Sequence, residues 1–168
     1  MKDAVMTTAT KTIKFDAAHV LTNHEGLCKN LHGHTYRVDV TLDKDAKTLT
    51  VCDNGIGMTA EELDRYICQI ALSGALEFVE KYEGENKNNG IIGHFGLGFY
   101  SSFMVSERVE VITKSYTDSH AVYWNCNADG EFETAAGMRN SHGTTVIMHI
   151  SEEEVAYLER EKIEEILE

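Results

Sequence analysis

Three histidines near the N-terminus have the residue type and the spacing of a metal site. His32 and His34 are one residue apart at the start of an expected strand, so their side chains point to the same face. His19 lies on the preceding expected strand, and three neutral imidazoles with an open fourth position are the ligands of catalytic zinc sites. A thiol close to a bound cation is deprotonated more easily, which makes Cys28 in the connecting loop a candidate base or nucleophile. Spacing alone leaves a second interpretation open, in which these are surface histidines on a polar strand face.

A second group of residues combines a carboxylate with glycines after a short strand. Gly55, Gly57 and Ala60 satisfy the G-x-G-x-x-A pattern of dinucleotide-binding loops. The second strand with an acidic residue about 20 positions later, which such a site needs, is missing. The segment Asp53-Asn54-Gly55 is also typical of a hairpin turn, because Asn-Gly is a strong turn former. The pattern by itself therefore leaves a turn and a nucleotide site as alternatives.

A glycine-rich loop further along the chain favours the nucleotide site. Its backbone N–H groups are unshielded by side chains just before an expected helix, and such a loop can bind phosphates. The carboxylate of Asp53 could accept a hydrogen bond from the exocyclic amine of adenine, whereas guanine presents an acceptor at that position. This loop includes Gly93, Gly96, Leu97, Gly98 and Phe99.

Hydrophobic periodicity predicts the elements that position these residues. Alternating apolar and polar residues predict strands. The last four expected strands follow one another directly and predict an antiparallel meander. The expected strands cover residues 11–21, 35–42, 49–51, 109–112, 121–124, 131–134 and 144–150.

Helical spacing predicts two helical regions in the same chain. One covers residues 60–83 with a break at Ser73-Gly74, and residues 84–98 after it form a loop. The other covers residues 151–168, where Ser151 and Glu154 have the spacing of a capping box. Strands and helices together predict an α+β fold.

Composition limits the classes of function. The chain has 168 residues, a formal net charge of −13, 42% hydrophobic and 26% charged residues, which predicts one compact soluble domain. The acidic excess repels phosphate backbones, so we expect no nucleic-acid partner. No long apolar segment or signal peptide is found, which predicts a cytoplasmic protein without a membrane partner. The four cysteines include no C-x-x-C pair, which favours reduced thiols.

The N-terminal region resembles the 6-pyruvoyl- and 6-carboxytetrahydropterin synthase family. The resemblance rests on the runs FDAAH at residues 15–19 and CKNLHGHTY at residues 28–36, and it covers about the first 43 residues. It implies that Cys28 is a catalytic base. The family's remaining catalytic Asp and His, and the Glu that anchors the pterin, have no match further along the chain. The residues that the resemblance implies as zinc ligands are His19, His32 and His34.

The chain from about Thr48 onward resembles the N-terminal ATP-binding domain of the ninety-kilodalton heat-shock chaperone, a member of the GHKL superfamily. The resemblance rests on DNGIGMTA at residues 53–60, the Ser73-Gly74 pair, GHFGLGFYS at residues 93–101 and GTTV at residues 143–146. It implies a two-layer α/β sandwich with a mostly antiparallel sheet, to which the N-terminal hairpin is added. It also implies that residues 84–98 form a mobile lid over bound ATP or ADP.

The chaperone resemblance assigns a role to each nucleotide-binding residue. Asp53 holds the adenine amino group, Gly57 and Met58 line the base pocket, and Thr144 supports adenine through water. The loop at 93–99 wraps the phosphates, with the residues given above. The helix that carries the family's water-activating Glu and magnesium-binding Asn has no counterpart, so we expect little or no ATP hydrolysis. Magnesium could accompany the nucleotide, but its Asn ligand is absent.

The sequence is therefore interpreted as a mosaic of two segments. Residues 1–47 form a pterin-synthase-like zinc hairpin, and residues 48–168 form a truncated chaperone-like ATP-binding domain. We expect adenine nucleotide and zinc as ligands, and homodimers or higher homo-oligomers because the lost helix exposes apolar area. Two alternatives remain, a zinc-dependent pterin-synthase-like enzyme and an inert folded scaffold.

Overall fold

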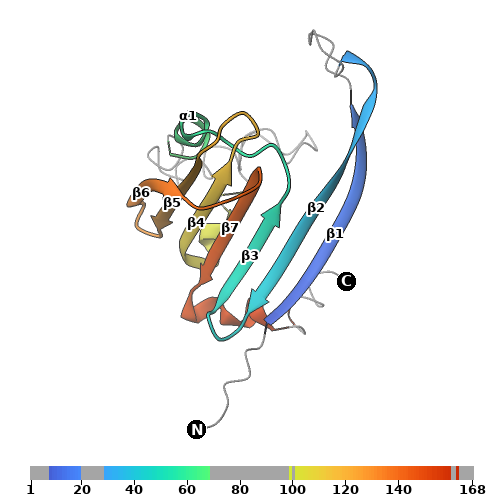
Figure 1. Ribbon diagram of the computed structural model, residues 1–168. Coiled ribbons are helices and arrows are strands. Elements are labelled where there is room, and N and C mark those ends of the chain that lie inside the picture. Colours follow the sequence, from blue (N-terminus) through green and yellow to red (C-terminus); the bar gives the residue numbers. More distant parts are fainter. Residues whose placement is uncertain (1–7, 20–28, 69–98, 100, 160–161, 163–168) are drawn as a thin grey trace, which may run out of the picture.

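One seven-stranded sheet organises the molecule (Figure 1). The computed structural model describes residues 8–19, 29–68, 99, 101–159 and 162, with only the backbone described at His19. The strands are β1 (Thr8–His19), β2 (His32–Asp43), β3 (Thr48–Asp53), β4 (Ser106–Lys114), β5 (Ala121–Asn127), β6 (Phe132–Gly137) and β7 (Gly143–Ile150).

The strand order is β1-β2-β3-β7-β4-β5-β6, and every neighbouring pair is antiparallel. The expected meander of the last four strands is wrong in one respect, because β7 does not pair with β6. Instead β7 lies between β3 and β4, with Val146 opposite Val51 on one side and Val111 on the other. This central place suits β7, since its Val146, Met148 and Ile150 alternate toward the core.

The expected two-layer α/β sandwich is wrong. The described helices are α1 (Ala60–Leu63), the π-helix η2 (Asp64–Cys68) and the 3₁₀ helices η3 (Ser101–Met104) and η4 (Glu152–Leu158). Helices of one or two turns bury too little surface to form a second layer over seven strands. The antiparallel sheet therefore dominates the part of the chain that the structure describes. Residues 69–83 of the expected helix and the lid at 84–98 lie outside the described residues.

The helix start signals differ from those expected. The first part of the expected helix at 151–168 is the 3₁₀ helix Glu152–Leu158, where Ser151 makes no side-chain cap hydrogen bond, and residues 160–161 and 163–168 lie outside the described residues. A capping box lies at Thr59 instead. The Glu62 N–H donates to Thr59 Oγ1 at 3.2 Å, and the Thr59 N–H donates to Glu62 Oε2 at 2.9 Å. Two backbone donors at the start of α1 are thus satisfied reciprocally.

The core lies on one face of the sheet, around Trp124. The Trp124 ring is fully buried between Phe99 and Phe132, at centroid distances of 5.8 and 6.4 Å. Leu63 of α1 is also fully buried and closes this side of the core. The buried apolar residues are Leu63, Cys68, Val109, Val111, Val122, Trp124, Cys126, Met148, Ile150 and Leu158.

The β1–β2 hairpin extends past the end of β3 (Figure 1). Residues Val38–Asp43 of β2 pair with β3, whereas the residues before Val38 pair only with β1 among the described strands. The outer half of the hairpin is thus a two-stranded ribbon. Among the described helices, none is long and apolar enough to span a membrane.

Candidate functional site

Asp53 is held by two backbone amides at the end of β3. Its Oδ1 accepts hydrogen bonds from the N–H groups of Gly55 at 2.7 Å and Thr144 at 3.2 Å. Both donors approach the same oxygen, so these two bonds leave Oδ2 for another donor. The carboxylate lies on the core-facing side of the sheet, since Asp53 follows Leu49 and Val51 at alternate positions. A fixed acceptor of this kind can bind a ligand amine.

Gly57 and Gly143 bring the backbone close to Asp53. Gly57 has a φ of +65°, and a Cβ there would lie 1.9 Å from the carbonyl oxygen of Lys114. Gly143 has a φ of +121°, and its Cβ would lie 2.3 Å from the carbonyl oxygen of Asp53. Only glycine avoids both the strained conformation and the collision. These positions fix the path of the loop that follows Asp53.

A pair of threonines lies behind the loop. The hydroxyls of Thr113 and Thr144 are 3.1 Å apart, and the Met58 N–H donates to Thr113 Oγ1 at 2.9 Å. Thr113 is fully buried among the apolar residues of β4. Met58 is half-buried and packs against the core. The structure thus brings together four residues of the predicted nucleotide site, namely Asp53, Gly57, Met58 and Thr144.

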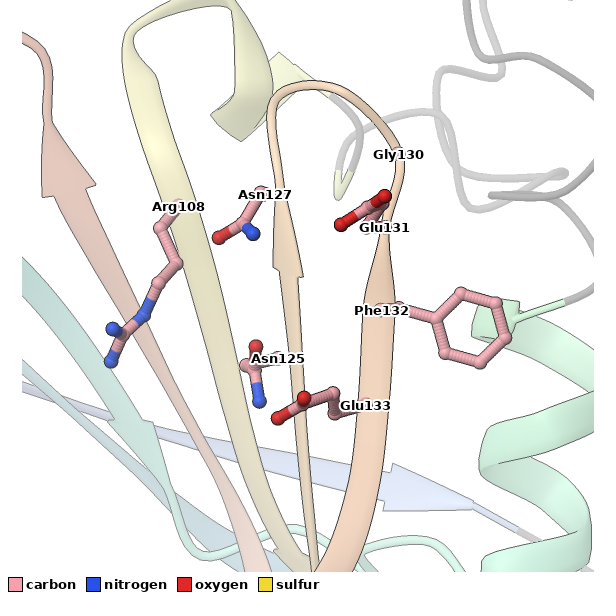
Figure 2. Close-up of a pocket in the computed structure, with 7 residues that line it drawn as sticks. All are labelled: Arg108, Asn125, Asn127, Gly130, Glu131, Phe132 and Glu133. Atoms are coloured by element: carbon pink, nitrogen blue, oxygen red, sulfur yellow. The ribbon is translucent and has the colours of Figure 1, made fainter.

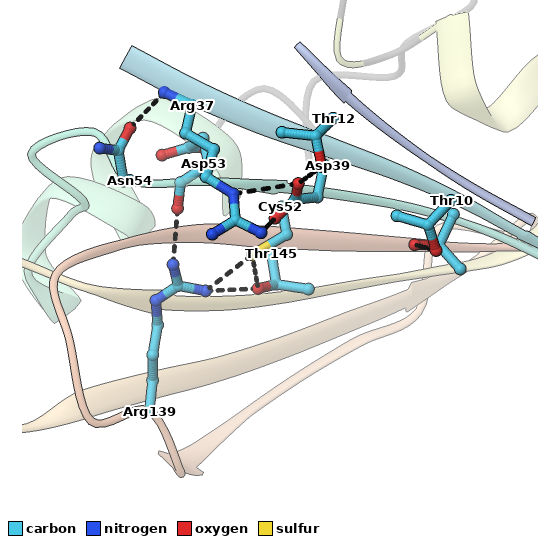
Figure 3. A network of polar contacts seen from close by, with 10 residues as sticks. Thr10, Thr12, Arg37, Asp39, Cys52, Asp53, Asn54, Arg139 and Thr145 are labelled. Atoms are coloured by element: carbon cyan, nitrogen blue, oxygen red, sulfur yellow. Dashed lines mark hydrogen bonds and ion pairs between the residues drawn. The ribbon is translucent and has the colours of Figure 1, made fainter. Parts of the chain in front are cut away.

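Arg139 was missed by the sequence analysis although it lies at this site (Figure 3). Its guanidinium donates to the carbonyl oxygen of Asp53 at 2.6 Å, to the Thr145 hydroxyl, and to Cys52 Sγ at 3.6 Å. It therefore ties the end of β3 to β7 from the side opposite the core. Arg139 lies alone between two strands, so hydrophobic periodicity could not have indicated it. Thr113, by contrast, could have been found from the sequence as a polar residue at an inward position of a strand.

The expected phosphate loop lies mostly outside the described residues. Gly93, Gly96, Leu97 and Gly98 are not described. Phe99 is described, and its ring packs against Trp124 and Phe103 as part of the core. Its side chain therefore has a structural role, and the expected contact with phosphates stays a prediction.

The histidines of the expected zinc site lie on the outer half of the hairpin. The rings of His32 and His34 have centroids 5.0 Å apart, and His19 is directly opposite His32 in the β1–β2 register. The Nδ1–H of His32 donates to the carbonyl oxygen of Asn30 at 2.9 Å. This hydrogen bond fixes the orientation of the imidazole ring, as second-shell carbonyls do in zinc sites. Cys28 lies outside the described residues.

The expected zinc and nucleotide residues share one face of the sheet. Val38 is directly opposite Asp53, and alternation along β2 places His34 and His32 on the same face as Val38. Val38 follows His34 by four positions along the strand, which corresponds to a distance of about 13 Å. The two groups are therefore neighbours without being in contact.

A polar cluster occupies the opposite face of the sheet. Glu110 accepts hydrogen bonds from Arg108 and, at 2.6 Å, from His149 Nε2. Burial raises the pKa of the Glu110 carboxyl, but hydrogen bonds from Arg108, His149 and Tyr123 outweigh it and bring this pKa below its usual value. This cluster links β4, β5 and β7 and includes none of the expected site residues.

A shallow hollow lies beside that cluster (Figure 2). It is lined by the Arg108 side chain, already paired with Glu110, by Glu133 of the edge strand β6 and by Glu131 just before that strand. None of the expected nucleotide or zinc residues lines it. The lining residues are Arg108, Asn125, Asn127, Gly130, Glu131, Phe132 and Glu133.

Two of the thiols are buried and unsuited to nucleophilic chemistry. Burial, helped by Asp129 and Cys68, raises the pKa of Cys126 to about 11. Burial, with the nearby Asp64, also raises the pKa of Cys68. Both groups are therefore protonated thiols at neutral pH.

Part of the chain matches a family of pterin enzymes. Residues 8–78 match the sequence model of the 6-pyruvoyl tetrahydropterin synthase family. The match includes the β1–β2 hairpin and its histidines, and it runs past the expected segment boundary at residue 47. The chain thus contains a segment similar to that family.

Much of the chain is also similar to bacterial chaperones. It is 52% identical over 132 residues to the chaperone protein HtpG of Porphyromonas gingivalis, covering 78% of this chain and 19% of that protein. It is 50% identical over 131 residues to HtpG of Bacteroides fragilis, covering 77% and 19%. HtpG of Sulfurimonas denitrificans is 44% identical over 149 residues, covering 88% and 23%.

The two similarities together define a mosaic. The chain is chaperone-related and also pterin-synthase-like, since each similarity covers a substantial part of it. It spans about a fifth of the length of the HtpG proteins that it matches. The activity of those whole proteins therefore enters only as a proposal below.

Proposed function

We propose that this protein binds adenine nucleotide at Asp53, with little or no ATP hydrolysis, and holds a zinc ion on its N-terminal hairpin. The observation that carries the nucleotide part is the Asp53 carboxylate. Two backbone amides hold its Oδ1 at 2.7 and 3.2 Å, which orients Oδ2 toward a ligand. The exocyclic amine of adenine is a donor of matching chemistry, and guanine has an acceptor at that position.

The surroundings of Asp53 support this proposal. Thr113 and Thr144 place two hydroxyls within 3.1 Å of each other beside the carboxylate, where a water could bridge them to a base. Met58 offers an apolar surface for the face of a base. The glycine at 57 keeps the loop close to β4 and to the backbone of Gly143. When bound, the nucleotide supplies the phosphates, for which Gly93, Gly96 and Gly98 stay the expected donors.

Weak or absent hydrolysis is part of the proposal. The described residues around Asp53 offer hydroxyls, backbone amides and the Arg139 guanidinium, but no second carboxylate that could activate water. Arg139 is fixed on backbone and Thr145 on the far side of Asp53. We therefore expect a binding module rather than a fast ATPase.

The zinc part rests on the donor set of the hairpin. Imidazole is a preferred zinc ligand, and the Asn30 carbonyl orients the His32 ring through its Nδ1–H. His19, His32 and His34 would hold the ion, which would polarise a bound substrate or water. The match of residues 8–78 to the pterin synthase family favours a second candidate function, a zinc-dependent pterin-synthase-like enzyme with Cys28 as base.

Calorimetry with magnesium ADP tests the nucleotide proposal. We expect a dissociation constant of about 10 µM for the zinc-loaded protein, near −7 kcal/mol. Asp53→Asn keeps the shape of the side chain but changes its charge and hydrogen bonding, and should weaken binding by at least about tenfold. Asp118→Asn, at a partly exposed carboxylate on the β4–β5 turn, is the matched control and should bind ADP normally. Absence of heat up to millimolar ADP contradicts the nucleotide part of the proposal and leaves the zinc hairpin and the inert scaffold as candidates.

A metal assay separates the remaining candidates. Zinc content by mass spectrometry should approach one ion per chain, and His34→Ala should abolish it. His120→Ala, an exposed histidine far from the hairpin, should leave the zinc content unchanged. Turnover of a pterin substrate by the zinc-loaded protein would favour the pterin-synthase-like enzyme, and Cys28→Ala should then remove this activity.

A further inference from the structure

β1 is an open edge of the sheet. In the described part of the chain only β2 pairs with β1, which begins the strand order. β1 has 12 residues, whereas β6 at the other edge has 6. The side chains from Thr8 to Asp16 are all exposed. A long exposed edge presents a row of unpaired N–H and C=O groups that another strand can pair with.

The two faces of β1 have opposite chemistry at its centre. Ile13 and Phe15 lie on the core-facing side yet are 48% and 51% exposed, although the Phe15 ring stacks on Tyr36 with centroids 5.2 Å apart. Alternation places Lys14 and Asp16 on the other face. A partner strand must therefore offer apolar residues on one face and matching charges on the other.

Lys14 has an unfavourable neighbour within the hairpin. The residue directly opposite it in β2 is Arg37, and like charges directly opposite each other destabilise a sheet. Arg37 forms an ion pair with Asp39 at 2.8 Å, while Asp16 accepts a hydrogen bond from the Thr35 hydroxyl at 2.6 Å. Asp39 thus neutralises Arg37 and also attracts Lys14, and a carboxylate on the open side would give Lys14 a further partner across the edge.

We infer that β1 pairs antiparallel with β1 of a second copy of this chain, with Phe15 opposite the partner's Phe15. In this register Lys14 lies opposite the partner's Asp16, and symmetry places Asp16 opposite the partner's Lys14. The interface is isologous and joins two seven-stranded sheets into one. It is independent of the nucleotide and zinc proposals.

Charge excludes the neighbouring registers. A shift of two residues is the smallest that keeps the apolar faces together. In one direction it places Lys14 opposite the partner's Lys14, and in the other it places Asp16 opposite the partner's Asp16. A shift of one residue sets the charged face against the apolar face. Among these neighbouring registers, charge therefore favours the one with Phe15 opposite the partner's Phe15.

Sedimentation equilibrium of the whole chain tests the dimer. Because strand pairing buries less area than a standard interface, we expect a dissociation constant of about 10–100 µM. Lys14→Glu creates two Glu–Asp contacts across the dimer, and Asp16→Lys creates two Lys–Lys contacts. Each single variant should weaken dimerisation by about tenfold or more.

A mixture of the two single variants tests the register itself. When a Lys14→Glu chain pairs with an Asp16→Lys chain, the interface contains one Glu–Lys and one Asp–Lys pair. The mixture should therefore form a heterodimer with an affinity close to that of the wild-type dimer. Glu153→Lys, an exposed reversal of the same size on η4, should dimerise like the wild type. Circular dichroism of each single variant shows that it is folded.

Three results would overturn the inference. They are a wild type that stays monomeric at about 100 µM, single variants that dimerise like the wild type, and folded single variants that fail to associate when mixed.

Discussion

Glu110 is a carboxylate held in its charged form within an acidic protein. Its side chain is 12% exposed and lies between Arg108 and His149. Burial acts to raise its pKa, and the hydrogen bonds from these two residues and Tyr123 lower it further than burial raises it. A pKa below the unfolded value means that the ionised form stabilises the fold.

We expect this contribution to depend on pH in one direction. It is fully present above the unfolded pKa of about 4.3 and is lost as the pH falls through the lower folded pKa. Glu110→Gln should reduce the free energy of unfolding by about 1–2 kcal/mol at pH 7, with a smaller reduction at pH 3. Urea unfolding at several pH values measures this, with the exposed Glu153→Gln as control. A reduction independent of pH would contradict it.

Thiol reactivity should follow burial. The thiolate is the reactive form, and the pKa of Cys126 is about 11. We expect Cys126 and Cys68 to resist a maleimide reagent in the native protein and to react fully in urea. Mass spectrometry of the labelled peptides measures this. Rapid native labelling of Cys126 would contradict the buried position.

Residue types and motifs predicted part of the site around Asp53. Gly57 and Met58 are close to Asp53 in sequence, so the same short motif contains all three. Arg139 is distant in sequence, and only the pairing of β3 with β7 brings it to Asp53. Such a contact depends on strand order, which residue types do not reveal.

At the scale of elements, the start of α1 offers a direct test. The capping box joins Thr59 and Glu62 by two hydrogen bonds of 3.2 and 2.9 Å. Thr59→Ala removes the acceptor of one bond, and should lower the free energy of unfolding by about 1 kcal/mol. Thermal unfolding measures the loss, and Thr117→Ala on the β4–β5 turn is a comparison outside any helix. An unchanged stability would mean that the cap does not contribute.

Gly57 gives a second test at this scale. Its φ of +65° and the position of the Lys114 carbonyl oxygen forbid a side chain. Gly57→Ala should destabilise the protein by about 2 kcal/mol or more. Gly130→Ala is the matched control, because its φ is also positive at +88° while nothing lies near its Cβ. Equal losses of stability in the two variants would show that backbone strain at positive φ, rather than the collision with Lys114, causes the destabilisation.

Alternation predicted where the strands lie but not how they are arranged. Each expected strand overlaps a strand of the structure, since period-two burial is a local property of the chain. The insertion of β7 between β3 and β4 is not local. The expected capping box at Ser151 was wrong, because the Ser151 side chain makes no cap hydrogen bond and its backbone N–H donates to the Val105 carbonyl.

At the scale of the whole molecule, the zinc hairpin and the Asp53 site should act independently. About 13 Å of strand separates His34 from the position opposite Asp53, which exceeds the screening length of about 8 Å at physiological salt. His34→Ala should therefore remove zinc while the ADP dissociation constant changes less than about twofold. Calorimetry with and without a chelator measures this. A large change in ADP affinity would contradict the separation of the two segments.

The position of β7 also constrains the order in which the chain can fold. The β1–β2 and β4–β5–β6 pairings join neighbours in sequence, whereas β3 meets β7 only after a loop of about a hundred residues closes. A growing chain on the ribosome can therefore form the hairpin early, but it must leave one side of β3 and one side of β4 open until Gly143–Ile150 has been synthesised. During that interval both central strands are open edges, and they are the surfaces that a cotranslational chaperone would have to protect.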